Sequence, residues 1–290
     1  MMRTTLLLFL AGFSWLAHAQ TTYVDSRGNT HRCGPFELSV LETDTLFADW
    51  YAENYTTFAM WEGATDWKAA LEGMEVDVYL GTWCGDSKRW VPQFVALWDA
   101  LGLDRDQLHF VALYNGTDQY KQGPNGEEKG LNIHRVPTFI FKEAGEEVAR
   151  IVESPANDLV TDVAQIALGV PSQPNYRGAT YTQNMLAHYS QQEIYDNYRE
   201  HVNAVYRLVK GTRELNTLGY VYLRAGEVEK ALMTFEMNTY FYPYDPNVFD
   251  SYGEALALAE RNEEAAAQYE KVLALDPENT NAQEQLAKLR

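Results

Sequence analysis

The chain has 290 residues, 46% of them hydrophobic, and a formal net charge of −18 at pH 7. Because single domains usually hold roughly 100 to 200 residues, this length and ordinary globular composition predict two domains. The excess of carboxylates repels phosphate groups and anionic lipid heads, which argues against nucleic-acid binding and membrane-surface binding.

Residues 1–19 have the pattern of a cleaved signal peptide. They contain one charge, at Arg3, a short apolar run over residues 6–10, and a small-x-small sequence at residues 17–19. The apolar run is shorter than the roughly 18 residues that a membrane helix needs. We therefore expect a mature chain that begins at Gln20, is periplasmic or secreted, and has no segment inserted in the membrane.

Residues 20–70 are expected to form an N-terminal helical extension. Aromatic residues recur there at steps of three, four or seven, as one apolar helix face requires. They are Phe47, Trp50, Tyr51, Phe58 and Trp61. We expect this face to pack against the next domain.

Residues 71–170 alternate between strand-like and helix-like patterns, which predicts an α/β domain. The expected elements are a strand at 76–80, a helix at 84–101, a strand at 108–114, a polar loop at 116–130, a hairpin of strands at 137–141 and 147–152, and a helix at 156–168. A polar, proline-bearing stretch at 171–178 is the expected linker to an all-α domain at 179–290.

The all-α domain contains an internal repeat. Four pairs of similar residues lie 34 positions apart: Gly219 and Gly253, Ala231 and Ala265, Phe235 and Tyr269, and Pro243 and Pro277. This period is typical of the tetratricopeptide helix pair. It predicts repeats at about 212–246 and 246–280, stacked helices at 181–210 and a closing helix at 279–290. We expect this domain to bind a protein partner, and the alternative is a dimerisation or packing element.

Two motifs of the α/β domain carry a family resemblance. Gly-Thr-Trp-Cys-Gly-Asp-Ser-Lys at residues 81–88 follows the first expected strand and opens a helix that contains Pro92, and Val-Pro-Thr follows at residues 136–138. On these motifs, residues 71–170 resemble the thioredoxin superfamily. The resemblance implies a thioredoxin-like fold, thiol–disulfide chemistry at Cys84, and a cis proline that faces its sulfur.

The chemistry of Cys84 follows from its place in the first turn of a helix. Unpaired backbone N–H groups and the positive end of the helix dipole favour the thiolate over the thiol. A thiolate attacks a disulfide to give a mixed disulfide, which a second thiol must then resolve. Ser87 stands where the resembled family has that second cysteine, and Val78 stands where it has a buried acid.

Three outcomes for Cys84 remain open. An outside thiol resolves the mixed disulfide, or Cys33 acts as a remote resolving thiol or a permanent disulfide partner, or the site is inactive and the fold serves as a binding scaffold. Loop closure does not exclude a pair between Cys33 and Cys84, because its cost grows only slowly with length.

The expected substrate is a protein or peptide thiol or disulfide. Val136 and Pro137 are expected to hold its backbone and Trp83 to contact it, whereas Ser87 either donates a hydrogen bond to the sulfur or fills space. We expect no metal and no cofactor, a solvent-exposed loop at 121–129 and a surface histidine at His134. The resulting hypothesis is an exported monothiol oxidoreductase with a protein-binding repeat domain, and the alternative is a redox-inactive adaptor.

Overall fold

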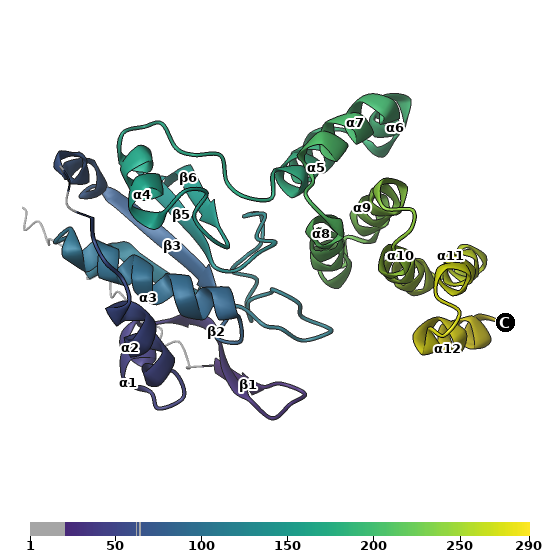
Figure 1. The fold of residues 1–290 in the computed structure, drawn as a ribbon, viewed down its shortest axis with the longest axis horizontal. Helices are drawn as coiled ribbons and strands as arrows, with labels where there is room; N and C mark the ends of the chain where they lie inside the picture. Colours follow the sequence, from purple (N-terminus) through teal and green to yellow (C-terminus); the bar gives the residue numbers. More distant parts are fainter. Residues whose placement is uncertain (1–20, 62, 64) are drawn as a thin grey trace, which may run out of the picture.

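The computed structural model describes residues 21–61, 63 and 65–290. The predicted signal peptide at residues 1–19 lies outside these residues. A mixed sheet with helices makes up an α/β region, residues 21–167, and an all-helical part makes up a helical region, residues 177–289 (Figure 1). The α/β and all-α classes expected from the sequence are both present at this level of description.

The sheet of the α/β region has six strands in the order β1-β2-β4-β3-β5-β6. Their bounds are β1 (Thr21–Val24), β2 (Thr30–Phe36), β3 (Met74–Leu80), β4 (Leu108–Ala112), β5 (Thr138–Glu143) and β6 (Glu146–Val152). The central strands β3 and β4 are parallel, and the other neighbours are antiparallel. The expected strands at 76–80, 108–114, 137–141 and 147–152 are confirmed to within a few residues.

Helices cover one face of this sheet. They are α1 (Ser39–Thr43), α2 (Ala48–Thr56), the 3-10 helix η1 (Asp66–Leu71), α3 (Gly85–Ala100) and α4 (Leu159–Ala167), and a 3-10 turn η2 (Arg105–Gln107) precedes β4. Val76, Val78 and Leu80 of β3 point into the core beneath the helices, whereas Tyr79 points to the opposite face, as the alternation of a strand requires. The loop between β4 and β5 covers that opposite face with Ile133 and neighbouring residues.

The expectation of a purely helical extension at residues 20–70 is wrong for residues 21–36. These residues form β1 and β2, and β2 joins the main sheet by pairing antiparallel with β4. The sequence pattern concealed β2 because this strand buries two polar side chains, His31 and Arg32, rather than alternating apolar with polar residues. The aromatic stretch that follows is helical in part, over α2 and η1.

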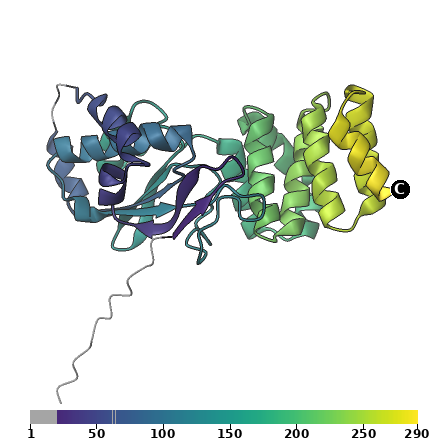
Figure 2. The same ribbon diagram turned by 90° about the horizontal axis from the view of Figure 1, so that it is seen from below.

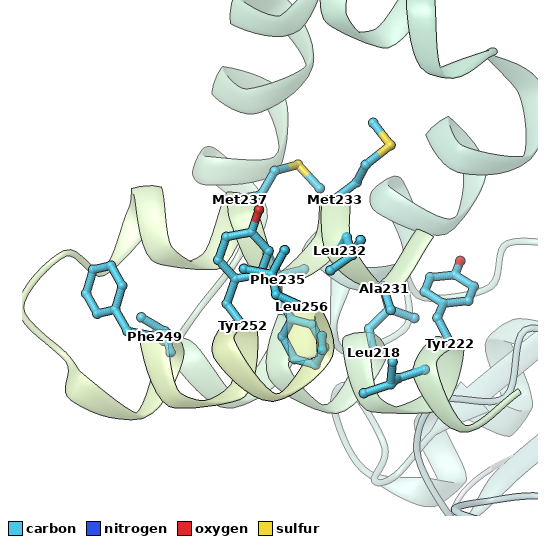
Figure 3. Close-up of a cluster of buried hydrophobic side chains, with 14 of the residues drawn as sticks. Leu218, Tyr222, Ala231, Leu232, Met233, Phe235, Met237, Phe249, Tyr252 and Leu256 are labelled. Atoms are coloured by element: carbon cyan, nitrogen blue, oxygen red, sulfur yellow. The ribbon is translucent and has the colours of Figure 1, made fainter. Parts of the chain in front are cut away.

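The helical region consists of successive helices that stand side by side in a row, with the C-terminus at its far end (Figure 2). They are α5 (Arg177–His188), α6 (Gln191–Asp196), α7 (Tyr198–Leu208), α8 (Thr212–Arg224), α9 (Val228–Phe241), α10 (Pro246–Leu258), α11 (Asn262–Leu275) and α12 (Thr280–Leu289). The expected closing helix corresponds to α12. One apolar core runs through the row, and Figure 3 shows Leu218, Phe235 and Leu256 among its side chains.

The helix pairs α8–α9 and α10–α11 repeat the same contact. Gly219 of α8 lies against the ring of Phe235, and Gly253 of α10 lies against the ring of Tyr269, so that a methyl group at either glycine would meet the ring. The absence of a side chain therefore lets the two helices of each pair approach closely. The 34-residue spacing of the sequence is thus matched by equivalent packing in the two pairs.

The α/β region and the helical region are joined by direct hydrogen bonds. Arg135 Nη2 donates to the carbonyl oxygen of Arg213 at 2.9 Å, and Gln122 Nε2 donates to the carbonyl oxygen of Arg224 at 2.6 Å. Residues 168–176, between α4 and α5, contain no helix or strand. Because Arg135 and Gln122 both belong to the loop between β4 and β5, this loop lies against α8.

Candidate functional site

The N-terminus of α3 positions Cys84. Cys84 is the residue that precedes the helix, with an extended backbone, and its N–H donates to the carbonyl oxygen of Gly81 at 2.8 Å. Its own carbonyl oxygen accepts from Lys88 N at 3.0 Å, which closes the first helical turn. The N–H groups of the first turn have no partner within the helix, so the sulfur lies beside the positive end of α3.

The sulfur of Cys84 faces the start of β5. Cys84 Sγ donates to the carbonyl oxygen of Val136 at 3.3 Å, and the peptide bond between Val136 and Pro137 is cis, as predicted. Cys84 is half-buried, whereas Val136 is buried. The structure thus brings together residues that lie 52 positions apart in the chain.

Trp83 and Ser87 have different surroundings. The indole N–H of Trp83 donates to the carbonyl oxygen of Leu113 at 2.9 Å, and the ring covers Gly81, where a Cβ would lie 2.5 Å from it. Ser87 is fully buried, and its hydroxyl oxygen accepts from Gly81 N at 3.1 Å. Trp83 is therefore available at the edge of the site, and Ser87 supports the turn that carries Cys84.

Cys33 lies in β2 and is only 1% exposed. Burial raises the pKa of its thiol, although a hydrogen bond with the Tyr114 hydroxyl acts in the opposite direction. Cys33 and Cys84 are both free thiols, so they are not bonded to each other in this structure. A buried thiol with a raised pKa is a poor nucleophile, because the thiolate is the attacking species.

The expectation of a solvent-exposed loop at 121–129 is wrong for Lys121 and Gly123, which are both buried. The side chain of Lys121 is 4% exposed. The backbone there folds back onto Tyr114, because Lys121 N donates to the Tyr114 carbonyl oxygen and Tyr114 N donates to the Gln122 carbonyl oxygen, each at 2.9 Å. The Lys121 ammonium contacts the Tyr120 hydroxyl and lies 5.9 Å from the centroid of the Trp83 ring. A single lysine in a polar segment carries no local signal of such burial.

His134 is also buried rather than exposed. Its ring meets Tyr176 edge-on with centroids 5.9 Å apart, and its Nε2 has no hydrogen-bond partner. Burial, helped by the nearby charge of Arg135, lowers the pKa of His134 to about 3. This histidine is therefore a neutral part of the junction between the two regions.

Charged side chains surround the site on the side of the helical region. Arg135, next to Val136, forms an ion pair of 3.3 Å with Glu153 as well as its bond to α8. Burial raises the pKa of Glu153, although Arg135 acts against this. Lys88, four residues after Cys84, places its ammonium 5.9 Å from the ring centroid of Trp50.

Among residues 21–61, 63 and 65–290, no group of three His, Cys, Asp or Glu side chains is arranged to hold a metal ion. None of the helices in this same part of the chain is long and apolar enough to cross a membrane. At the site itself, Cys84 offers a half-buried thiol at a helix N-terminus.

Comparison of the sequence with protein-family models gives no match, and a search of curated proteins gives none either.

Proposed function

We propose that this chain is an exported, thioredoxin-like thiol–disulfide oxidoreductase that acts through a single cysteine, Cys84. The observation that supports it most strongly is the contact of Cys84 Sγ with the Val136 carbonyl oxygen, beside cis Pro137. The order of β3, α3, β4, a loop, the β5–β6 hairpin and α4 is the one predicted from the strand-like and helix-like patterns of residues 71–170, and it is compatible with a thioredoxin-like fold. Export rests on the signal-peptide pattern of residues 1–19.

The reaction begins when the Cys84 thiolate attacks one sulfur of a substrate disulfide. A bond forms between Cys84 and that sulfur, the substrate S–S bond breaks, and the other substrate sulfur leaves as a thiolate. Ser87 has no sulfur with which to resolve the adduct. We therefore assign resolution to an outside thiol, which attacks the mixed disulfide and releases Cys84.

The helical region is the part of the chain that would bind the protein partner. The equivalent packing of the pairs α8–α9 and α10–α11 supports tetratricopeptide-type repeats, in which stacked helix pairs present an extended surface to a partner. Arg135 links the loop that precedes Pro137 to α8, so a protein bound by the repeats would lie near Cys84.

The test is turnover of a peptide disulfide with glutathione as the outside thiol. Wild-type protein is expected to accelerate the exchange, Cys84→Ser to lose the acceleration, and Cys33→Ser to retain it because Cys33 is buried. Circular dichroism establishes that both variants are folded. Equal rates for wild type and Cys84→Ser would contradict the proposal, and loss of activity in Cys33→Ser alone would assign the chemistry to the other thiol.

A second candidate is a redox-inactive adaptor, which is favoured by exposed aromatic side chains on the helical region. Tyr206, Tyr240 and Tyr244 are 59%, 67% and 86% exposed. Aromatic side chains of this kind are enriched at protein interfaces. The adaptor predicts that a partner captured by the wild type is still bound by Cys84→Ala and is lost when Tyr240 and Tyr244 are changed to serine.

A further inference from the structure

Lys121 is a buried cation without an acidic partner. It lies in the loop between β4 and β5, 4% exposed, with its ammonium at the Tyr120 hydroxyl and 3.9 Å from the centroid of the Tyr120 ring. No ion pair joins it to a carboxylate of the described residues. Burying an ammonium in this way costs free energy that a carboxylate would normally offset.

Burial and the charges around Lys121 bring the pKa of its side chain close to neutral pH. Burial, followed by the charge of Arg135, lowers its pKa to about 7, whereas a thiolate at Cys84 and the carboxylate of Glu153 favour the ammonium. The neutral ring of His134 lies near enough to respond to this ammonium. Amine and ammonium are therefore both populated near neutral pH, as a group that exchanges protons requires.

Thiol–disulfide exchange at Cys84 needs such a group. The Cys84 thiol must lose its proton before attack, and the departing sulfur must gain one. Val78, six residues before Cys84 on β3, is fully buried and apolar, so it offers no carboxyl group beneath the site. The Ser87 hydroxyl oxygen already accepts a hydrogen bond from Gly81 N.

We propose that Lys121 is the proton-transfer residue of the Cys84 reaction, an inference that rests on the function proposed above. Its amine lies 3.9 Å from the centroid of the Tyr120 ring and 5.9 Å from the centroid of the ring of Trp83, the residue next to Cys84 in the chain.

The protons balance over one exchange. The neutral Lys121 amine takes the proton of the Cys84 thiol, which gives an ammonium and a thiolate. The thiolate attacks the substrate disulfide, one S–S bond forms and one breaks, and the second substrate sulfur leaves as a thiolate. The Lys121 ammonium then returns the proton to that sulfur and becomes an amine again.

The experiment compares two disulfides that differ in their leaving group. Glutathione disulfide releases a basic aliphatic thiolate that benefits from a proton, whereas 5,5′-dithiobis(2-nitrobenzoate) releases an aromatic thiolate that is stable without one. The rate of mixed-disulfide formation at Cys84 is measured for wild type, Lys121→Met and Lys121→Arg. Lys129→Met, which removes an exposed lysine of the same loop, is the matched control.

Lys121→Met and Lys121→Arg are expected to slow the reaction with glutathione disulfide about 100-fold, the low end for a positioned acid or base. They are expected to slow the reaction with the aromatic disulfide by a clearly smaller factor, because removal of the Cys84 proton is then lost but return of a proton to the leaving sulfur is not needed. Lys129→Met is expected to change neither rate. Equal losses with both disulfides would show that Lys121 returns no proton to the leaving sulfur, and equal rates for wild type and Lys121→Met would remove it from the reaction, so either result overturns the inference. If wild-type Cys84 reacts with glutathione disulfide no faster than a free cysteine, the proposed function fails first, and this inference fails with it.

Discussion

Replacement of Gly219 by alanine is expected to destabilise the helical region, although alanine is the better helix former. The added Cβ would lie 2.6 Å from two ring carbons of Phe235, and ordinary contact begins near 3.4 Å. The ring must therefore retreat by roughly 0.8 Å. Phe235 is fully buried and packs against the Tyr220 ring at 5.2 Å, so it has little room to move.

The expected magnitude is the difference of two opposing terms. Glycine to alanine in a helix interior favours folding by about 1 kcal/mol. Overpacking of a close-packed core costs about 1–3 kcal/mol. We therefore expect Gly219→Ala to lower the free energy of unfolding by about 1 kcal/mol, the middle of the overpacking range less the gain in helix propensity.

Gly253→Ala is the matched control, because the same contact is looser in the second helix pair. Its Cβ would lie 3.1 Å from the nearest atom of the Tyr269 ring, so a movement of a few tenths of an ångström relieves it. Gly253→Ala is expected to leave the free energy of unfolding unchanged or to raise it by up to about 1 kcal/mol, since the helix-propensity gain is then barely opposed.

Urea unfolding followed by far-ultraviolet circular dichroism measures both variants. Six of the seven tryptophans lie between residues 50 and 98, and the seventh, Trp15, lies in the predicted signal peptide, so tryptophan fluorescence of the mature chain follows the α/β region separately. In a Phe235→Leu background, which frees the space, Gly219→Ala should become stabilising. Equal or greater stability of Gly219→Ala in the wild-type background, or a larger loss in Gly253→Ala, would refute this account of the packing.

Three further predictions concern pH and redox chemistry. Burial raises the pKa of Asp99, but hydrogen bonds led by Arg105 outweigh it and hold the pKa below its usual value, so this carboxylate stabilises the fold above pH 4 and the contribution is lost on acidification. Asp99→Asn should therefore cost roughly 1 kcal/mol at pH 7, and urea unfolding should show this difference shrink as the pH falls below the usual carboxyl pKa. Because the pKa of His134 is lowered to about 3, the unfolded chain binds an extra proton between that pH and about 6.5, and stability falls on acidification. His134→Gln should flatten this slope by up to about 1.4 kcal/mol per pH unit, and an unchanged slope would contradict its neutral burial. Ser87→Cys should form a disulfide with Cys84 on oxidation, seen as joint protection of both thiols from alkylation, and two thiols that stay reactive after oxidation would count against the site geometry.

The central elements of the α/β region were predictable from sequence because each has a strong local pattern. β3 and β5 are short apolar runs, and α3 begins directly after Cys84 as the motif requires. β2 was missed because it buries Arg32 and His31, whose polarity imitates a loop. Its partner β4 lies more than seventy positions further along the chain, a relation that no local window contains.

The candidate site was only partly predictable, for a similar reason. The motif around Cys84 and the Val136–Pro137 dipeptide carried the family resemblance, and the resemblance predicted that the proline faces the sulfur. Burial of Lys121 and His134 depends instead on the loop between β4 and β5 folding against α8. Such long-range contacts leave no periodic trace in the sequence, so both side chains were expected at the surface.

Trapping the reaction intermediate tests the central claim most directly. Native protein is mixed with a peptide disulfide, quenched with acid and mapped by peptide mass spectrometry, so that Cys84 and Cys33 are read in the same sample. The account predicts a rapid peptide adduct at Cys84 and an unmodified Cys33, because only Cys84 is both accessible and at a helix N-terminus. An unmodified Cys84, or an adduct confined to Cys33, would contradict it.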